Sequence, residues 1–278
     1  MIRNCLGERG IEIVPNGAPS DVRLVNSACP EPVNKPFIFL DVCDHVDALP
    51  RRQRGHGHAD IYAKLSRRRA ASEYELLPII TSWRREKGTT WTETVPTLFE
   101  RDLDLVFMGV IQYGSTPLSW ECKHDPEQHR RDCLRVIEGH RSKRKYIRWT
   151  HGKGRFARGA EPLPFDEYMG ILRRTKVVVS PWGYGEWCWR DFEAIRAGCV
   201  LLKPRCDVVT CPNIYRDGWV EWYDPDHSDL ENKIDKVLAS IQAGAYPSRQ
   251  PMVTELLEAT LPHKTANVFE AIVKSCAG

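Results

Sequence analysis

The segment SPWGYGEWCWRDFEAIRAGCVLLKP, residues 180–204, indicates the class of fold that this chain adopts. It follows an apolar run at 177–179, passes through a loop rich in Gly and Trp, and continues as helix-compatible sequence to Ala197. Gly198 is well placed to end that helix, and residues 199–202 form another apolar run. The order strand, loop, helix, strand is the repeating unit of α/β domains. The segment therefore predicts a parallel sheet with helices packed on it.

The same alternation continues along the chain. After residue 100 the pattern predicts further strands and helices, in chain order at 105–109, 126–139, 145–149, 165–173, 219–223 and 229–242. Before residue 100 it predicts short strands at 11–14, 21–25 and 37–40. We therefore expect an α/β fold with two Rossmann-like domains, residues 1–100 and 101–278, that face each other across a cleft.

Composition narrows the class of protein. The 278 residues include 40 basic and 37 acidic side chains, a balance that does not predict a nucleic-acid partner. Ten cysteines are scattered without a C-x-x-C pair, so we expect reduced thiols. The sequence shows no basic leader with an apolar core and no apolar run near ~18 residues. These features predict a soluble, cytoplasmic protein without a membrane-spanning segment.

The helix within 180–204 carries a candidate ligand site. If it begins near Trp187, Arg190 and Glu193 share one face, which places a cation in the opening turn and a carboxylate one turn later. A helix N-terminus with an arginine is suited to a diphosphate, and an acid in this position accepts hydrogen bonds from ribose. Gly183 and Gly185 allow close backbone approach, and Tyr184 and the tryptophans offer flat surfaces. The alternative is a surface Arg190–Glu193 ion pair beside a core aromatic cluster.

The same residues resemble the donor-binding motif of exostosin-type glycosyltransferases. That motif is a Gly-Tyr-Gly loop followed by R-x-F-E-A-x-x-A-G-C. The matching residues here are Gly183, Tyr184, Gly185, Arg190, Phe192, Glu193, Ala194, Ala197, Gly198 and Cys199. The match is specific over about twenty residues and looser over roughly 105–245. Two departures are Leu201, where the family often has Pro, and Gly185, where related enzymes have the first acid of an E-x7-E motif. Glu186 produces E-x6-E instead, and its contact with the sugar is an expectation from the resemblance.

The resemblance implies a fold and an activity. Exostosin-type enzymes have the GT-B fold and transfer a sugar, usually from a UDP-sugar, with inversion at the anomeric carbon. It further implies that Arg190 and Glu193 grip the diphosphate and nucleoside, that the acceptor is a carbohydrate or glycoconjugate, and, from compact viral members, that the donor is UDP-xylose. The membrane anchor of animal members is missing, so the chain looks like the compact soluble relatives of microbes and large viruses.

An inverting transfer needs a base for the acceptor hydroxyl and positive charge for the leaving group. In a GT-B fold the base comes from the first domain, and our candidates directly follow the strand at 37–40: Asp44, then Asp41, then His45. Asp44 also fits as the N-cap of a helix that begins at His45. Lys153 and Arg155 are candidates for the diphosphate, with a polar loop as the alternative.

Two other functions remain open. A metal-dependent transferase would use a D-x-D motif, for which Asp102 with Asp104 and Asp224 with Asp226 are formal matches. A non-catalytic nucleotide- or carbohydrate-binding module would keep Arg190 and Glu193 but need no base. The His56-x-His58 pair has no third ligand nearby in the sequence, and we expect neither a metal nor a cofactor beyond the UDP-sugar co-substrate.

Overall fold

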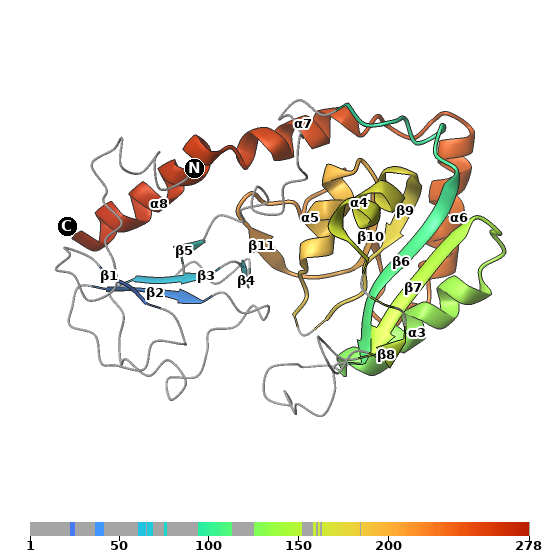
Figure 1. Ribbon diagram of the computed structural model, residues 1–278, viewed down its shortest axis with the longest axis horizontal. Coiled ribbons are helices and arrows are strands. Elements are labelled where there is room, and N and C mark those ends of the chain that lie inside the picture. Colours follow the sequence, from blue (N-terminus) through green and yellow to red (C-terminus); the bar gives the residue numbers. More distant parts are fainter. Residues whose placement is uncertain are drawn as a thin grey trace. The chain divides into compact units, whose positions relative to one another are not determined.

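The computed structural model describes five short segments before residue 77 and most of the chain from residue 94 onward (Figure 1). The described residues are 23–25, 37–41, 61–64, 66–68, 75–76, 94–112, 125–151, 158–159, 161, 163–183 and 185–277. Contacts group the chain into a first unit, 1–83 with 207–214 and 258–278, and a second unit, 84–206 with 215–257. Two segments predicted for the C-terminal domain thus group with the first unit. The arrangement of two domains across a cleft stays a prediction.

A six-stranded sheet forms the centre of the second unit. Its order is β12-β10-β9-β6-β7-β8, and neighbours run parallel except for β8, which is antiparallel to β7. The strands are β6 (Leu103–Gln112), β7 (Lys145–His151), β8 (Arg158–Gly159), β9 (Thr175–Val179), β10 (Val200–Pro204) and β12 (Val220–Tyr223). Every residue of β9 and β10 is buried. A parallel strand covered on both faces needs apolar side chains on both, which explains the continuous apolar runs in the sequence.

Helices cover both faces of this sheet (Figure 1). The helices α3 (Pro126–Gly139) and α6 (Leu230–Gln242) share one core cluster with alternate strand residues, among them Leu105, Phe107 and Val179. The helices α4 (Phe165–Arg173) and α5 (Trp189–Arg196) contact β9 and β10 respectively. The result is a three-layer α/β/α unit. The predicted limits of the helices at 126–139 and 165–173 are confirmed.

Local sequence explains where these helices begin and end. The Asp125 carboxylate accepts hydrogen bonds from the backbone N–H groups of Glu127 and Gln128, at 2.9 and 3.0 Å, and Pro126 stands in the first turn of α3. Gly198, with φ of +72°, ends α5 as predicted.

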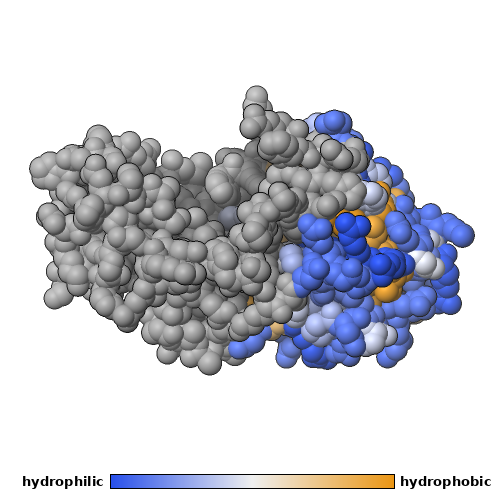
Figure 2. All heavy atoms as spheres, turned by 90° about the horizontal axis from the view of Figure 1, so that it is seen from below, coloured by the Kyte–Doolittle hydropathy of each residue, from blue (hydrophilic) through white to orange (hydrophobic). Residues whose placement is uncertain are grey.

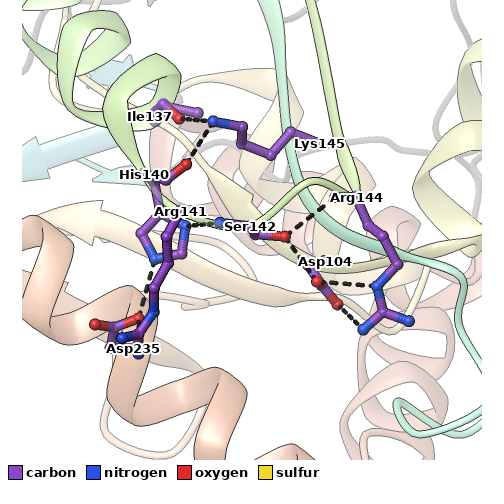
Figure 3. A network of polar contacts seen from close by, with 8 residues as sticks. All are labelled: Asp104, Ile137, His140, Arg141, Ser142, Arg144, Lys145 and Asp235. Atoms are coloured by element: carbon purple, nitrogen blue, oxygen red, sulfur yellow. Dashed lines mark hydrogen bonds and ion pairs between the residues drawn. The ribbon is translucent and has the colours of Figure 1, made fainter.

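Charged groups tie together the amino ends of β6 and β7 (Figure 3). The Asp104 carboxylate accepts hydrogen bonds from Arg144 Nη2 at 2.7 Å and Ser142 Oγ at 2.8 Å, and it also contacts Lys176 Nζ at 2.9 Å. Burial opposes ionisation of Asp104, but these donors outweigh burial and lower its pKa. Asp104 therefore has a structural role. It lies at the amino end of β6, whereas the loop before α5 follows the carboxyl end of β9.

Beside this cluster, the Lys145 side chain binds the free carbonyl groups at the C-terminus of α3 (Figure 3). Its Nζ atom donates to the carbonyl oxygens of Ile137 at 3.0 Å and His140 at 2.7 Å. A cation at a helix C-terminus satisfies carbonyls that have no partner within the helix. The His140 ring, in turn, lies 3.1 Å from Asp235 of α6. These contacts fix the turn that connects α3 to β7.

In the first unit, a four-stranded parallel sheet has the order β1-β2-β3-β5. These strands are β1 (Arg23–Val25), β2 (Phe37–Asp41), β3 (Ile61–Lys64) and β5 (Glu75–Leu76). A separate antiparallel pair joins β4 (Ser66–Arg68) to β11 (Val208–Thr210). The chain ends with α7 (Gln250–Ala259) and α8 (Pro262–Ala277), and α8 contacts β2. The strands predicted at 21–25 and 37–40 are confirmed, whereas 11–14 lies outside the described residues.

One face of the second unit is mainly polar (Figure 2). Figure 2 shows mainly hydrophilic side chains on the coloured face, with apolar atoms visible between them. Within the described ranges, no helix is both long and apolar enough to cross a membrane.

Candidate functional site

The candidate site lies at the carboxyl end of β9, where residues 180–188 lead into α5. In parallel α/β sheets, ligands bind outside the carboxyl ends of the strands. The helix opens after Cys188, whose backbone N–H donates to Asp191 Oδ2 at 3.1 Å. Within the loop, the Gly183 N–H donates to the Gly185 carbonyl at 3.0 Å. The loop thus turns tightly before it presents the helix N-terminus.

A buried charge cluster fixes this opening turn. The Asp191 carboxylate accepts hydrogen bonds from Ser180 Oγ at 2.6 Å and from the Tyr215 hydroxyl, and it lies 2.8 Å from Lys203 Nζ. Burial disfavours the charged carboxylate, but the Lys203 ammonium and the hydroxyl donors outweigh burial and lower the pKa of Asp191. Sequence reasoning missed this cluster; the lysine that ends the apolar run at 200–202 was its only signal.

Arg130 ties the loop to the neighbouring strand. Its Nε donates to the Trp182 carbonyl at 2.7 Å and its Nη1 to the Val110 carbonyl at 2.5 Å. The His129 ring stacks on Trp182, with centroids 5.1 Å apart and planes inclined by 17°. The loop is therefore held from α3 and from the end of β6. Arg130 was not predicted, because its role depends on the packing of α3 against β6.

Arg190 reaches across to the carboxyl end of β6. A Cβ atom added at Gly109 would lie 2.2 Å from Arg190 Nη2, closer than real Cβ contacts, and 3.1 Å from its Cζ, which is a tight contact. The guanidinium carbon also lies 5.9 Å from the ring centroid of Phe107. Gly109 is therefore required for the observed place of this guanidinium. The available signal in the sequence was the glycine after the apolar run at 105–108, which lies within the strand predicted at 105–109.

Glu193 contacts a helix that sequence analysis had not connected with the site. The Tyr168 hydroxyl of α4 donates to Glu193 Oε2 at 2.9 Å. Burial, followed by the charge of Glu193, raises the pKa of Tyr168 well above its ordinary value. The phenol therefore stays protonated and serves as a hydrogen-bond donor. Arg190 and Glu193 thus stand on α5 with separate contacts, to β6 and to α4.

One expectation about the loop is wrong. Trp187 does not offer a flat surface to a ligand, because it is 1% exposed and makes edge contacts with Trp189 and Phe192. Phe192 and Ile195 are buried as well, so this side of α5 packs into the unit. The aromatic residues of the motif therefore contribute at least in part to the core.

The other predicted residues fall into two groups. Gly183, Gly185 and Glu186 lie in the described loop before α5, and Asp41 is the last residue of β2, in register with Lys64 of β3. The remaining candidates lie outside the described residues: Asp44, His45, Lys153, Arg155, Tyr184, and the pair His56 and His58. Their roles stay predictions.

The two D-x-D matches lie at opposite ends of the parallel strands, one at the amino end of β6 and the other after the carboxyl end of β12. Asp102 forms an ion pair with Arg174 and Asp104 is held by Lys176, both before or at the start of β6. Asp224 and Asp226 follow β12, with Asp224 3.5 Å from Arg205 Nε and Asp226 accepting from the Ser228 hydroxyl at 2.7 Å. Among the described residues, no three His, Cys, Asp or Glu side chains gather closely enough to hold a metal ion.

Chemically, the arrangement offers a guanidinium, the N-terminus of an eight-residue helix and a carboxylate one turn later. The first two attract an oxyanion such as a phosphate, and the third accepts hydrogen bonds from hydroxyl groups. A ligand that carries phosphates next to a sugar therefore suits the site: its phosphates match the guanidinium and the helix N-terminus, and its sugar hydroxyls match the carboxylate.

Comparisons with known proteins address the fold. No family model and no curated protein sequence matches the chain. A solved structure is similar in fold, described as an alpha-glucosyltransferase in complex with UDP and a 13-mer DNA containing an HMU base. The TM-score is 0.50 at 10% identity, over 93% of this chain and 80% of the other. The chain therefore has a mixed α/β fold with a parallel sheet, similar to the fold of this glycosyltransferase.

Proposed function

We propose that the chain is a glycosyltransferase that transfers a sugar from a UDP-sugar to a hydroxyl group of a glycan or glycoconjugate. The observation that carries the proposal is the pair Arg190 and Glu193 on α5, at the carboxyl edge of the parallel sheet. Arg190 stands in the first turn of α5, where a helix N-terminus and a guanidinium together suit a diphosphate, and Glu193, one turn further on, would accept hydrogen bonds from the ribose.

Two independent features support this function. The residues from Gly183 to Cys199 resemble the exostosin-type donor motif, and the fold is similar to that of an enzyme solved with UDP. The first feature concerns about twenty residues, and the second concerns nearly the whole chain. Both features support our proposal that the fold is of the GT-B type, in which two Rossmann-like domains face each other.

The finer features of the proposal come from the exostosin resemblance. The transfer is inverting, with Asp44, Asp41 or His45 as the base that accepts the proton of the acceptor hydroxyl. Arg190, the α5 N-terminus, Lys153 and Arg155 stabilise the leaving diphosphate, so the reaction needs no metal ion. The preferred donor is UDP-xylose. The proposed cytoplasmic location comes instead from the scattered cysteines, for which we expect reduced thiols.

Two classes of acceptor are considered, a carbohydrate hydroxyl and a hydroxyl on a modified DNA base. We propose a carbohydrate hydroxyl, as in exostosin-type enzymes. The DNA bound to the similar α-glucosyltransferase makes a hydroxyl on a modified base the competing acceptor, although the small excess of 40 basic over 37 acidic residues does not by itself predict binding to a polyanion.

A binding experiment tests the donor site. Calorimetry with UDP, GDP and a panel of UDP-sugars is expected to show the tightest binding for uridine nucleotides. Arg190→Ala removes a charge-assisted contact and should weaken UDP binding by roughly 1.5–3 kcal/mol. The matched control is Arg141→Ala, because Arg141 is 80% exposed and pairs with Asp235 at 3.0 Å, away from α5. Unchanged UDP affinity in folded Arg190→Ala protein would remove the basis of the proposal.

A turnover experiment separates an enzyme from a binding module. UDP release from UDP-xylose is measured alone, with xylose- or galactose-containing oligosaccharides, and with DNA that contains hydroxymethyluracil. Acceptor-dependent release with an oligosaccharide supports the proposal, and release only with DNA assigns the other acceptor class. Tight UDP binding without release on any acceptor indicates the non-catalytic module.

A further inference from the structure

Tyr168 lies in the first turn of α4. Its backbone N–H donates to the Pro164 carbonyl at 2.9 Å in the first turn, and its ring stacks on Phe165 with centroids 6.2 Å apart. The neighbouring Met169 is completely buried, which anchors the helix in the core. The phenol is therefore presented from a fixed backbone, and its hydroxyl reaches Glu193 Oε2 at 2.9 Å.

This contact restricts the Glu193 carboxylate. A glutamate side chain has three rotatable bonds and loses much rotamer freedom when it is ordered. A hydrogen bond to one oxygen selects the rotamers that keep this oxygen beside α4. An ionised carboxylate has about four acceptor positions, and the phenol uses one of them. Hydroxyl groups of a ligand then meet a carboxylate whose orientation is already set.

The donor character of Tyr168 persists over the useful pH range. Burial raises the pKa of this phenol well above 10, and the charge of Glu193 raises it further, while the nearby Arg190 opposes part of that rise. The hydroxyl consequently keeps its proton at every pH at which a nucleotide would be assayed. The hydrogen bond from Tyr168 to Glu193 therefore depends on the positions of the two side chains, because the phenol does not titrate in this pH range.

We propose that Tyr168 is a positioning residue that orients Glu193 toward the ribose of the bound nucleotide and thereby sets a preference for ribonucleoside over deoxyribonucleoside diphosphates. The proposal rests on the proposed donor site. Its physical basis is preorganisation: a carboxylate held in one orientation discriminates strongly between a ligand with the matching hydroxyl and one without it.

The test compares affinities for UDP, 2′-deoxy-UDP and 3′-deoxy-UDP by calorimetry. In the wild-type protein, loss of the hydroxyl that Glu193 accepts should weaken binding about tenfold or more. Glu193→Ala should abolish that discrimination and so identify the hydroxyl. Tyr168→Phe, which keeps the ring and removes only the hydroxyl, should reduce UDP affinity by roughly three- to tenfold and leave affinity for the corresponding deoxy nucleotide unchanged.

A matched control exists in the same unit. The Tyr246 hydroxyl donates to Glu221 Oε1 at 2.8 Å, so Tyr246→Phe removes a comparable tyrosine–glutamate hydrogen bond away from α5. It should change neither affinity nor discrimination. In the double variant Tyr168→Phe with Glu193→Ala, the tyrosine substitution should have no further effect on UDP affinity, because it acts through the glutamate.

The outcomes separate this inference from the proposed function. A wild-type protein that binds no uridine nucleotide overturns the donor site itself. A protein that binds UDP, loses discrimination with Glu193→Ala and keeps it with Tyr168→Phe overturns only the role of Tyr168. Equal binding of UDP and both deoxy nucleotides by the wild type also overturns the inference, while the diphosphate site stands.

Discussion

The carboxylate of Asp191 lies 2.8 Å from the Nζ atom of Lys203, and neither side chain is exposed to solvent. Asp191 belongs to the first turn of α5 and Lys203 to β10, so the pair joins the opening of the helix to the sheet. Arg190, the residue next to Asp191, depends on this turn for its direction.

Removal of one partner should be costly. Lys203→Met leaves the buried Asp191 carboxylate without its cation, and we expect a loss of about 3–5 kcal/mol in the free energy of unfolding. The measurement is a urea unfolding curve followed by circular dichroism. Arg135→Met is the control, because Arg135 is exposed in an ion pair with Asp132 and should change stability by less than about 0.5 kcal/mol. A Lys203→Met protein as stable as the control would refute the structural role of the pair.

His227 predicts a dependence of stability on pH. Burial lowers its pKa below the ordinary 6.5, so the folded state binds fewer protons than the unfolded state as the pH falls below that value. Its contribution to stability is fully present above 6.5 and is lost as the pH falls through the lowered folded pKa. His227 has φ of +65°, a conformation that asparagine tolerates. The expected result is a smaller slope of unfolding free energy against pH, below 6.5, in His227→Asn. Equal slopes in the wild-type protein and in His227→Asn would contradict the lowered pKa of His227 as a source of this pH dependence.

Gly109 predicts an effect on binding without an effect on the fold. In Gly109→Ala the new methyl group overlaps Arg190 Nη2, so the guanidinium must move. We expect UDP affinity to fall about tenfold or more, as for loss of a charge-assisted contact. Gly170→Ala is the control, because its added Cβ meets nothing within 4 Å. That change within α4 should preserve affinity and stabilise the protein by about 0.5–1 kcal/mol. Equal affinities in the two variants would show that the place of Arg190 does not matter for UDP.

The proposed base predicts a separation of binding from turnover. Asp44→Asn keeps the shape and capping ability of the side chain but cannot accept a proton. We expect normal UDP affinity and a decrease in acceptor-dependent turnover of ~10²-fold or more. Asp47→Asn, in the same segment, should keep its turnover. If Asp41→Asn loses activity and Asp44→Asn does not, Asp41 is the base; if both retain activity, His45 is tested next.

The cationic groups that we propose for the diphosphate predict a reaction that is independent of metal. Arg190, the helix N-terminus, Lys153 and Arg155 would neutralise a leaving diphosphate without a cation. Turnover should therefore persist in excess EDTA. Activity that disappears with the chelator and returns with Mn²⁺ would transfer the assignment to Asp224 and Asp226, which follow β12.

Much of the second unit was predictable because its signals are local. Asp125 and Pro126 mark the start of α3, Gly198 ends α5, and the apolar runs at 177–179 and 199–202 are long enough to indicate buried parallel strands. Capping, left-handed glycine geometry and hydrophobic periodicity depend on a few neighbouring residues. The sequence also placed Arg190 and Glu193 on the same helix by spacing alone.

The partners of these side chains depended on tertiary structure. Tyr168 meets Glu193 across 25 positions of sequence, and Arg130 meets Trp182 across 52. The guanidinium of Arg190, on α5, lies in the space that a side chain at Gly109 of β6 would fill. Such pairs form only when the parallel crossovers place α3, α4 and α5 around β6 and β9. Sequence spacing determined which residues α5 presents, whereas the order of the strands decided what each of them touches, because contacts between elements depend on distance in space and not on separation along the chain.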